Sequence, residues 1–261
     1  MTHSLSWRSA LASLALGALA LSGCDSSGPD DRPPAPISAA AFQAGVDAFP
    51  NDAARTAGAG AGENYAQAAV RVGVVTALVG LNLAVPHLAT EAVTQDTPEV
   101  VDGVWVWETT EDVLGTPVAL RLEADPDGSE VDWRLTSQRL GNDPGGPFTY
   151  YTATTSTDGR TGAWRLFLPD QDGVVLTAEF DVRDDREVTF AVPAGRDGGG
   201  SSVRYRTEGS TQTFDLVREP GGARSTVRWD LGTGAGSITA DAYRGGARAC
   251  WDRQLRDVAC G

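Results

Sequence analysis

The sequence predicts a mainly β protein: an antiparallel meander of about twelve strands forming a barrel or strongly bent half-barrel, with an apolar helix packed in or across it. Three observations predict this fold. From about Gly103 onward, short runs of alternating apolar and polar residues are separated by Gly- and Asp-rich turns. Before that point lies an uncharged apolar stretch long enough for one helix. The composition, 41% hydrophobic and 21% charged, suits a packed core.

The strands are expected wherever side chains alternate with a period of two. Val131, Trp133 and Leu135 show this pattern, as expected for a strand with one buried face. Tight turns such as residues 125–128 (DPDG) join the segments, so neighbouring strands should pair antiparallel. A meander of this length is expected to curl rather than stay flat. The expected strands are residues 103–110, 118–124, 130–137, 148–155, 162–169, 174–182, 187–192, 203–208, 212–217, 226–231, 237–243 and 247–252.

The expected helix covers residues 64–85, with Pro86 ending or kinking it. No charged residue occurs between Arg71 and Glu91. A helix that is apolar all round is typically buried in protein or embedded in a membrane. Large side chains form one line along it, and small residues form another, which we expect to approach the backbone of the sheet. The small residues are Ala66, Ala69, Gly73, Ala77, Gly80 and Ala84; the large ones are Val70, Val74, Leu78, Leu81 and Val85.

The first 23 residues have the features of an export signal. Arg8 gives a positive start, and residues 10–21 form an apolar run too short to span a membrane. Leu21-Ser22-Gly23-Cys24 follows. Here the chain resembles bacterial lipoproteins, whose lipobox is Leu, a small residue, Gly or Ala, then Cys. The resemblance implies that Cys24 is acylated and becomes the new N-terminus, so that acyl chains anchor the protein to a membrane.

Further segments follow the signal. Residues 24–37 are rich in Pro and Asp and are expected to form an extended tether. Residues 38–98 form the helical segment, which begins with a short amphipathic helix carrying Phe42, Val46 and Phe49. Residues 99–261 form the β domain.

Cysteine usage points to an oxidising compartment. With Cys24 taken by lipid, Cys250 and Cys260 remain. Two nearby thiols in an exported protein are expected to form a disulfide. A redox pair is the alternative, but the spacing is not C-x-x-C. We expect the protein in the cell envelope, anchored to the outer membrane and facing the periplasm or the exterior.

The same cysteines bear on the apolar helix. The uncharged run from Val72 to Thr90 is just long enough to cross a bilayer. A span there would carry Cys250 and Cys260 into a reducing cytosol, and the flanks lack an Arg cluster and an aromatic belt. We therefore favour a helix that covers the apolar face of the sheet, with a membrane span or a helix lying in a membrane interface as alternatives.

Catalytic and metal-binding patterns are sparse. After loss of the signal, His87 is the only histidine, and no metalloprotease, phosphate-loop or nucleophile-elbow motif occurs. We expect no cofactor, no metal and no catalytic residue, although paired carboxylates leave an acidic hydrolase open. The net charge of −14, with all 21 basic residues Arg, argues against nucleic acid as a partner.

The remaining candidates are ligand contacts. Thr76 and Asn82 are polar groups in an apolar helix, which either bond to neighbouring backbone or enter a pocket. Leu78 and Leu81 lie beside them. Trp105 and Trp107 share one strand face and serve either as core or as a sugar-stacking platform; together these six residues are the candidate ligand-facing set.

The whole mature chain resembles exported lipoproteins of no known activity, which combine an apolar helix with a Trp-rich meander ending in Cys-Trp-Asp. The expected function is non-enzymatic: binding of a hydrophobic small molecule or lipid in the helix-covered barrel. The alternative is a structural or interaction role with a filled barrel and no pocket.

Overall fold

The computed structural model describes residues 32–35, 49, 61–113, 115–141, 146–183 and 185–261. The chain divides into two compact units, residues 1–32 and 33–261, and the fold described below is that of the second. Cys24, the expected acylation site, and most of the short helix expected around Phe42 and Val46 lie outside the described residues.

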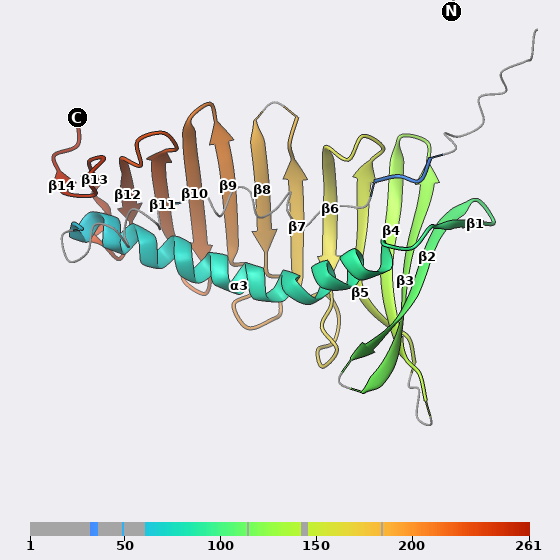
Figure 1. Cartoon of the computed structure of the whole chain (residues 1–261). Helices are drawn as coiled ribbons and strands as arrows, with labels where there is room; N and C mark the ends of the chain where they lie inside the picture. Colours follow the sequence, from blue (N-terminus) through green and yellow to red (C-terminus); the bar gives the residue numbers. More distant parts are fainter. Residues whose placement is uncertain (1–31, 36–48, 50–60, 114, 142–145, 184) are drawn as a thin grey trace, which may run out of the picture. The chain divides into compact units, whose positions relative to one another are not determined.

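The described part of the chain is one antiparallel sheet and one long helix (Figure 1). All fourteen strands follow each other in the sheet in sequence order, so every strand pairs only with its neighbours along the chain. The strands are β1 (Glu99–Val101), β2 (Val104–Val113), β3 (Thr116–Asp127), β4 (Glu130–Arg139), β5 (Phe148–Ser156), β6 (Thr161–Leu166), β7 (Leu176–Asp181), β8 (Arg186–Ala191), β9 (Ser202–Glu208), β10 (Thr211–Arg218), β11 (Ala223–Asp230), β12 (Gly236–Ala240), β13 (Ala249–Trp251) and β14 (Asp257–Val258).

The sheet is not closed, so the barrel, one of the two forms expected from the sequence, is not confirmed. No pairing between β1 and β14 occurs among the described strands, so the two are the edges of the sheet. The twelve expected segments correspond to β2–β13. The two additional strands are the short edges, which have too few residues to show an alternating pattern.

Helix α3 (Glu63–Val93) crosses one face of this sheet, from β12–β14 at its start to β2 and β3 at its end (Figure 1). It is longer than expected, because the helix continues through Pro86 instead of ending there. Pro86 is buried, and its carbonyl oxygen accepts a hydrogen bond from the Thr90 hydroxyl at 2.8 Å.

The core lies between α3 and the face of the sheet that it covers. Strand register places large and small side chains alternately along a row that crosses the strands. Cross-strand pairs of this kind are the unit of packing in a sheet, and alternation of size lets neighbouring layers interdigitate. The row runs Ala124, Trp133, Ala153, Trp164, Ala178 and Phe190, and all six side chains are buried.

The final strands are fixed to the start of α3. The disulfide between Cys250 and Cys260, expected from the sequence, is present, with the two Cα atoms 5.3 Å apart. Trp251 packs edge-on against Tyr65 of α3, with 5.9 Å between ring centroids. A Cβ atom on Gly236 would lie 2.4 Å from the Trp251 ring, so this strand position requires glycine.

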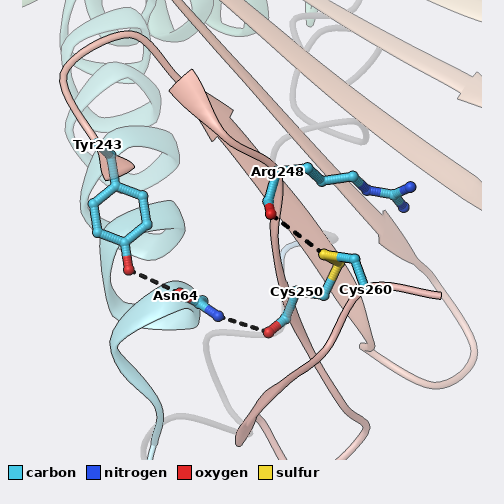
Figure 2. The surroundings of a disulfide bond; sticks show 5 residues. All are labelled: Asn64, Tyr243, Arg248, Cys250 and Cys260. Carbon is cyan, nitrogen blue, oxygen red and sulfur yellow. Dashed lines mark hydrogen bonds between the residues drawn. A yellow bond between two sulfur atoms is a disulfide. The ribbon is translucent and has the colours of Figure 1, made fainter. Parts of the chain in front are cut away.

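Asn64 joins the same elements through hydrogen bonds (Figure 2). Its side-chain nitrogen donates to the carbonyl oxygen of Cys250 at 2.7 Å, and its side-chain oxygen accepts from the Tyr243 hydroxyl at 2.8 Å. Its backbone nitrogen donates to Asp257 at 3.0 Å. The buried residue Asn64 therefore ties the helix start to three separate points near the C-terminus, two through its side chain and one through its backbone nitrogen.

We expect Asn64→Ala to lower the free energy of unfolding by about 2 to 4 kcal/mol, because it leaves the buried Cys250 carbonyl and Tyr243 hydroxyl without this partner. Urea unfolding followed by circular dichroism measures the loss. Asn82→Ala is the matched control: its amide bonds only to Leu78 of the same helix, so a change within about 0.5 kcal/mol is expected. Equal losses in the two variants would contradict the assigned role of Asn64.

Candidate functional site at the helix–sheet junction

Helix α3 presents three different faces, and the sheet buries only one of them. The packed face carries a mixed set of side chains, some aromatic and some polar. Apart from the adjacent Asn64 and Tyr65, they follow each other at intervals of three, four or eleven residues, as one side of a helix requires. The fully buried residues are Asn64, Tyr65, Ala68, Val72, Leu83, Pro86, Thr90 and Val93.

Most of the small-residue face does not approach the sheet, which corrects the sequence-based expectation, although Ala69 packs against the core. Ala66, Ala77, Gly80 and Ala84 are exposed. A Cβ atom added to Gly73 or Gly80 would meet no heavy atom within 4 Å. The sheet instead contacts the face with the most varied side chains, because cross-strand rows of unequal size pack best against a surface of unequal size.

Two polar contacts fix the middle and end of α3 on the sheet. The Thr76 hydroxyl lies 3.3 Å from the hydroxyl of Tyr205 on β9. The Thr90 hydroxyl lies 3.1 Å from the hydroxyl of Tyr151 on β5. Burial disfavours the charged phenolate and raises the pKa of both Tyr151 and Tyr205 to about 12.

A narrow apolar groove lies where α3 meets β7–β10, and we call it the β7–β10 groove. It has a volume of about 330 Å³. Its helix wall consists of Val74, Val75, Leu78, Val79 and Asn82. The sheet side consists mainly of apolar residues, with hydroxyls and one guanidinium at one end: Leu176, Phe190, Ala191, Val192, Ser201, Ser202, Val203, Leu216 and Arg218.

A second groove, the β2–β5 groove, lies farther along α3 and holds about 650 Å³. It is more polar, since Glu111, Asp112 and Arg139 join Val85 and Leu88 in its lining. The two grooves are built in the same way. In each, side chains of α3 form one wall and the covered face of the sheet forms the floor. Apolar space that a ligand could enter therefore lies beside the helix and not inside a barrel.

The structure brings some of the candidate ligand-facing residues together and separates the others. Leu78 and Asn82 line the β7–β10 groove. Thr76 is half-buried and contacts Tyr205, whereas Leu81 is exposed on the outer side of α3. The residue types along α3 could not show this division, because apolar residues occur on all three of its faces.

Trp105 and Trp107 lie far from the β7–β10 groove, on β2. Trp107 is buried and stacks with Trp133, with 6.2 Å between ring centroids. Trp105 is half-buried and packs against the same core. Neither ring therefore exposes a flat face of the kind that stacks on sugars.

Sequence reasoning missed Arg218 and the apolar floor residues Phe190, Val203 and Leu216. Their alternation on β8, β9 and β10 was visible, but it indicates only that they share a covered face. Which helix residues stand opposite them depends on strand register, which sequence pattern leaves open.

The other titratable groups of the described chain include several carboxylates with a shifted pKa. No cluster of three or more His, Cys, Asp or Glu side chains suited to a metal occurs among the described residues. Hydrogen bonds from Arg183 lower the pKa of Asp181 to about 2. Hydrogen bonds also lower the pKa of Asp158, Asp230 and Asp252, and the main donors are the Ser156 hydroxyl, the Ser210 hydroxyl and the Arg256 backbone N–H, respectively. His87 Nε2 lies 3.3 Å from Oε1 of Glu91, which is one turn farther along α3.

Helix α3 is also long and apolar enough to cross a membrane, although this criterion rests on length and composition alone. No protein-family model matches the chain, and no curated protein matches it.

The raised pKa values of Tyr151 and Tyr205 predict instability in alkali. The folded pKa of about 12 exceeds the unfolded value of about 10, so the stability is fully present below pH 10 and is lost as the pH rises towards 12. The loss is about 1.4 kcal/mol per tyrosine and pH unit in this window.

Urea unfolding at pH 9, 10.5 and 11.5 tests this linkage. A Tyr151→Phe/Tyr205→Phe variant should show a much flatter dependence on pH in the same window. Tyr150→Phe is the control, because Tyr150 is only half-buried. A wild-type stability that does not change over this range would contradict the burial of the two phenols.

Proposed function

We propose that this chain is a lipid-anchored, non-enzymatic protein of the cell envelope that binds a hydrophobic small molecule or lipid chain in the β7–β10 groove. The observation that carries the proposal is the groove itself: apolar space of about 330 Å³ with few polar groups. Ligand sites typically have volumes of about 300 to 1,000 Å³, mostly apolar linings and a few polar groups that orient the ligand.

The lining favours an amphiphile with an acidic head. Val75, Val79, Phe190, Val203 and Leu216 offer contacts to an acyl chain. Arg218 at the end of β10 offers a guanidinium, the group best shaped to bind a carboxylate or phosphate through two hydrogen bonds. Arg218 forms no ion pair within the described residues. A fatty acid or a similar single-chain anion fits this distribution of charge.

Anchoring and compartment come from other residues. The lipobox ending at Cys24 supports acylation of that cysteine and retention at a membrane. We propose that this membrane is the outer membrane. The Cys250–Cys260 disulfide supports an oxidising compartment such as the periplasm or the cell exterior. In this proposal, the anchor and the compartment keep the groove within reach of a source of lipid.

The second candidate is a structural or interaction protein. It is favoured by the dense packing between α3 and the sheet, where the row of alternating Trp and Ala residues leaves the central core filled. An acidic hydrolase has less support, because each described carboxylate with a resolved pKa shift has a lowered pKa, whereas a general acid needs a raised pKa.

We expect the purified protein to bind a fatty acid, detected by native mass spectrometry and by displacement of an apolar fluorescent dye. Leu216→Asp should weaken binding at least about tenfold, because a carboxylate in the apolar groove is desolvated by the ligand. Leu231→Asp is the matched control, since Leu231 is exposed in the turn after β11. No bound lipid and no dye displacement would refute the proposal.

Arg218→Met should separate recognition of the head from recognition of the chain. We expect it to weaken binding of a fatty acid several-fold while leaving the fatty alcohol of equal chain length unchanged, because only the acid carries a charge for the guanidinium. Arg134→Met, on the opposite face of the sheet, is the control. Equal losses for acid and alcohol would contradict the role assigned to Arg218.

Cys24→Ser should abolish acylation. Metabolic labelling with palmitate followed by membrane fractionation measures it: the wild type incorporates label, and the variant does not. Cys250→Ser/Cys260→Ser is the control and should keep the label, because these two thiols form the disulfide. Label that persists in Cys24→Ser would refute the lipobox.

A further inference from the structure

The outer face of α3 is a continuous line of large apolar side chains. Its six members follow each other at intervals of three or four residues, so they form one straight line along the helix. They are between 52% and 73% exposed. The line consists of Val70, Val74, Leu78, Leu81, Val85 and Leu88, and we call it the outer stripe.

A helix on the surface of a soluble domain normally directs polar and charged residues outward. Here the outward side lacks any charge from Val72 to Thr90, and the exposed small residues beside the outer stripe extend the apolar surface around the helix. Soluble monomers rarely expose apolar patches of this extent, and such patches typically mark an interface.

A transmembrane span does not explain the outer stripe. It would remove α3 from the sheet and break the bonds of Asn64, Thr76 and Thr90 to strands and loops far along the chain. It would also expose the covered face of the sheet, including Trp107, Trp133 and Trp164. The helix must therefore meet its apolar partner while its other side stays on the sheet (Figure 1).

The surface of a bilayer satisfies this condition. An amphipathic helix can lie in the interface plane with its apolar side buried about 5 to 10 Å into the boundary of headgroups and acyl chains. Residues 25–62 separate Cys24 from α3 and can reach on the order of 100 Å when fully extended. An acylated Cys24 would thus hold the outer stripe within reach of the membrane at high effective concentration.

Charge at the borders of the outer stripe fits the same partner. Arg218 and Arg139 line the two grooves on α3, and both side chains are exposed. Neither forms an ion pair within the described residues. Arginines at the edge of an apolar surface can bind lipid phosphates. Glu111 and Asp112 line the β2–β5 groove together with Arg139, and carboxylates of a second copy would also bind guanidinium groups. The choice of a bilayer as the partner therefore rests on the anchor, and the quenching experiment below distinguishes a bilayer from a second copy.

We propose that the outer stripe of α3 inserts into the interfacial layer of the phospholipid bilayer that holds the lipid anchor, with the sheet lying outside the membrane. The inference rests on the proposed function for the anchor alone. It also deepens that function: Val74 and Leu78 belong both to the outer stripe and to the β7–β10 groove, so the groove opens towards the membrane and a lipid chain can enter from it.

Site-specific fluorescence on the full-length acylated protein tests the proposal. Leu81→Cys is labelled with an environment-sensitive dye and reconstituted with vesicles of phosphatidylethanolamine and phosphatidylglycerol, some carrying nitroxide-labelled lipids. Arg134→Cys, on the uncovered face of the sheet, is the matched control. Leu81 is exposed, so its replacement leaves the core intact, and circular dichroism checks the β content of both variants.

The expected result is a blue-shifted emission at position 81 and strong quenching by nitroxides placed high on the acyl chain, with neither effect at position 134. Water-like emission at position 81 would overturn the proposal. A blue shift without quenching by lipid nitroxides would also overturn it, because it indicates burial against a second copy. Strongest quenching from the bilayer centre would indicate a span and overturn it as well.

Failure of the anchor is detected separately. The protein without an added cysteine is treated with the same dye, and its mass is measured. Dye attached at Cys24 shows that this residue is not acylated, which refutes the anchor but not the outer stripe. Vesicles added to a Cys24→Ser/Leu81→Cys protein, in which position 81 is the labelled site, then give the fluorescence readout without the anchor.

Discussion

The structure depends on one constraint: an open sheet of fourteen strands has a long apolar face, and in the described part of the chain one helix covers it. Each strand pairs only with its sequence neighbours, so the sheet has two free edges, and no second sheet packs against it among the described residues. Helix α3 meets this requirement by lying across the strands rather than along them. Its 31 residues are needed because it must extend from β14 to β2.

This arrangement explains why polar groups occur along the packed face of an apolar helix. Hydrophobic burial is non-directional and would allow α3 to rotate or slide over the sheet. Asn64, Thr76 and Thr90 bond to groups near its start, middle and end, and so fix both its rotation and its position. The disulfide then fixes the C-terminal strands against which the helix begins.

The same constraint generates the candidate site. A straight helix cannot fill the whole width of a broad sheet, so grooves remain along its sides where strand ends project past it. Their walls are apolar because the helix is apolar on every side. The helix that completes the core thus also creates the proposed ligand groove and the proposed membrane surface, and adjacent side chains such as Val74 and Leu78 serve both.

The sequence by itself determined the local structure. Alternation and turn residues predicted β2–β13 with the correct order and direction, because hairpin turns join sequence neighbours and period-two patterning is local. The cysteine spacing predicted the disulfide, and the uncharged run predicted a helix over the sheet. The edge strands β1 and β14 were not predicted, since two or three residues show no period.

Only the tertiary structure decided how these elements combine. Whether a meander closes depends on the accumulated geometry of many strands, and here it stays open. Which face of α3 packs on the sheet depends on the shape of the sheet surface opposite it. Residue size alone predicted that Gly73 and Gly80 would face the sheet, but they face away from it. Arg218 and Leu216 became groove residues only once strand register placed them beside Leu78 and Asn82. Sequence periodicity records which residues share a face, whereas the partner of that face is set by contacts between distant parts of the chain.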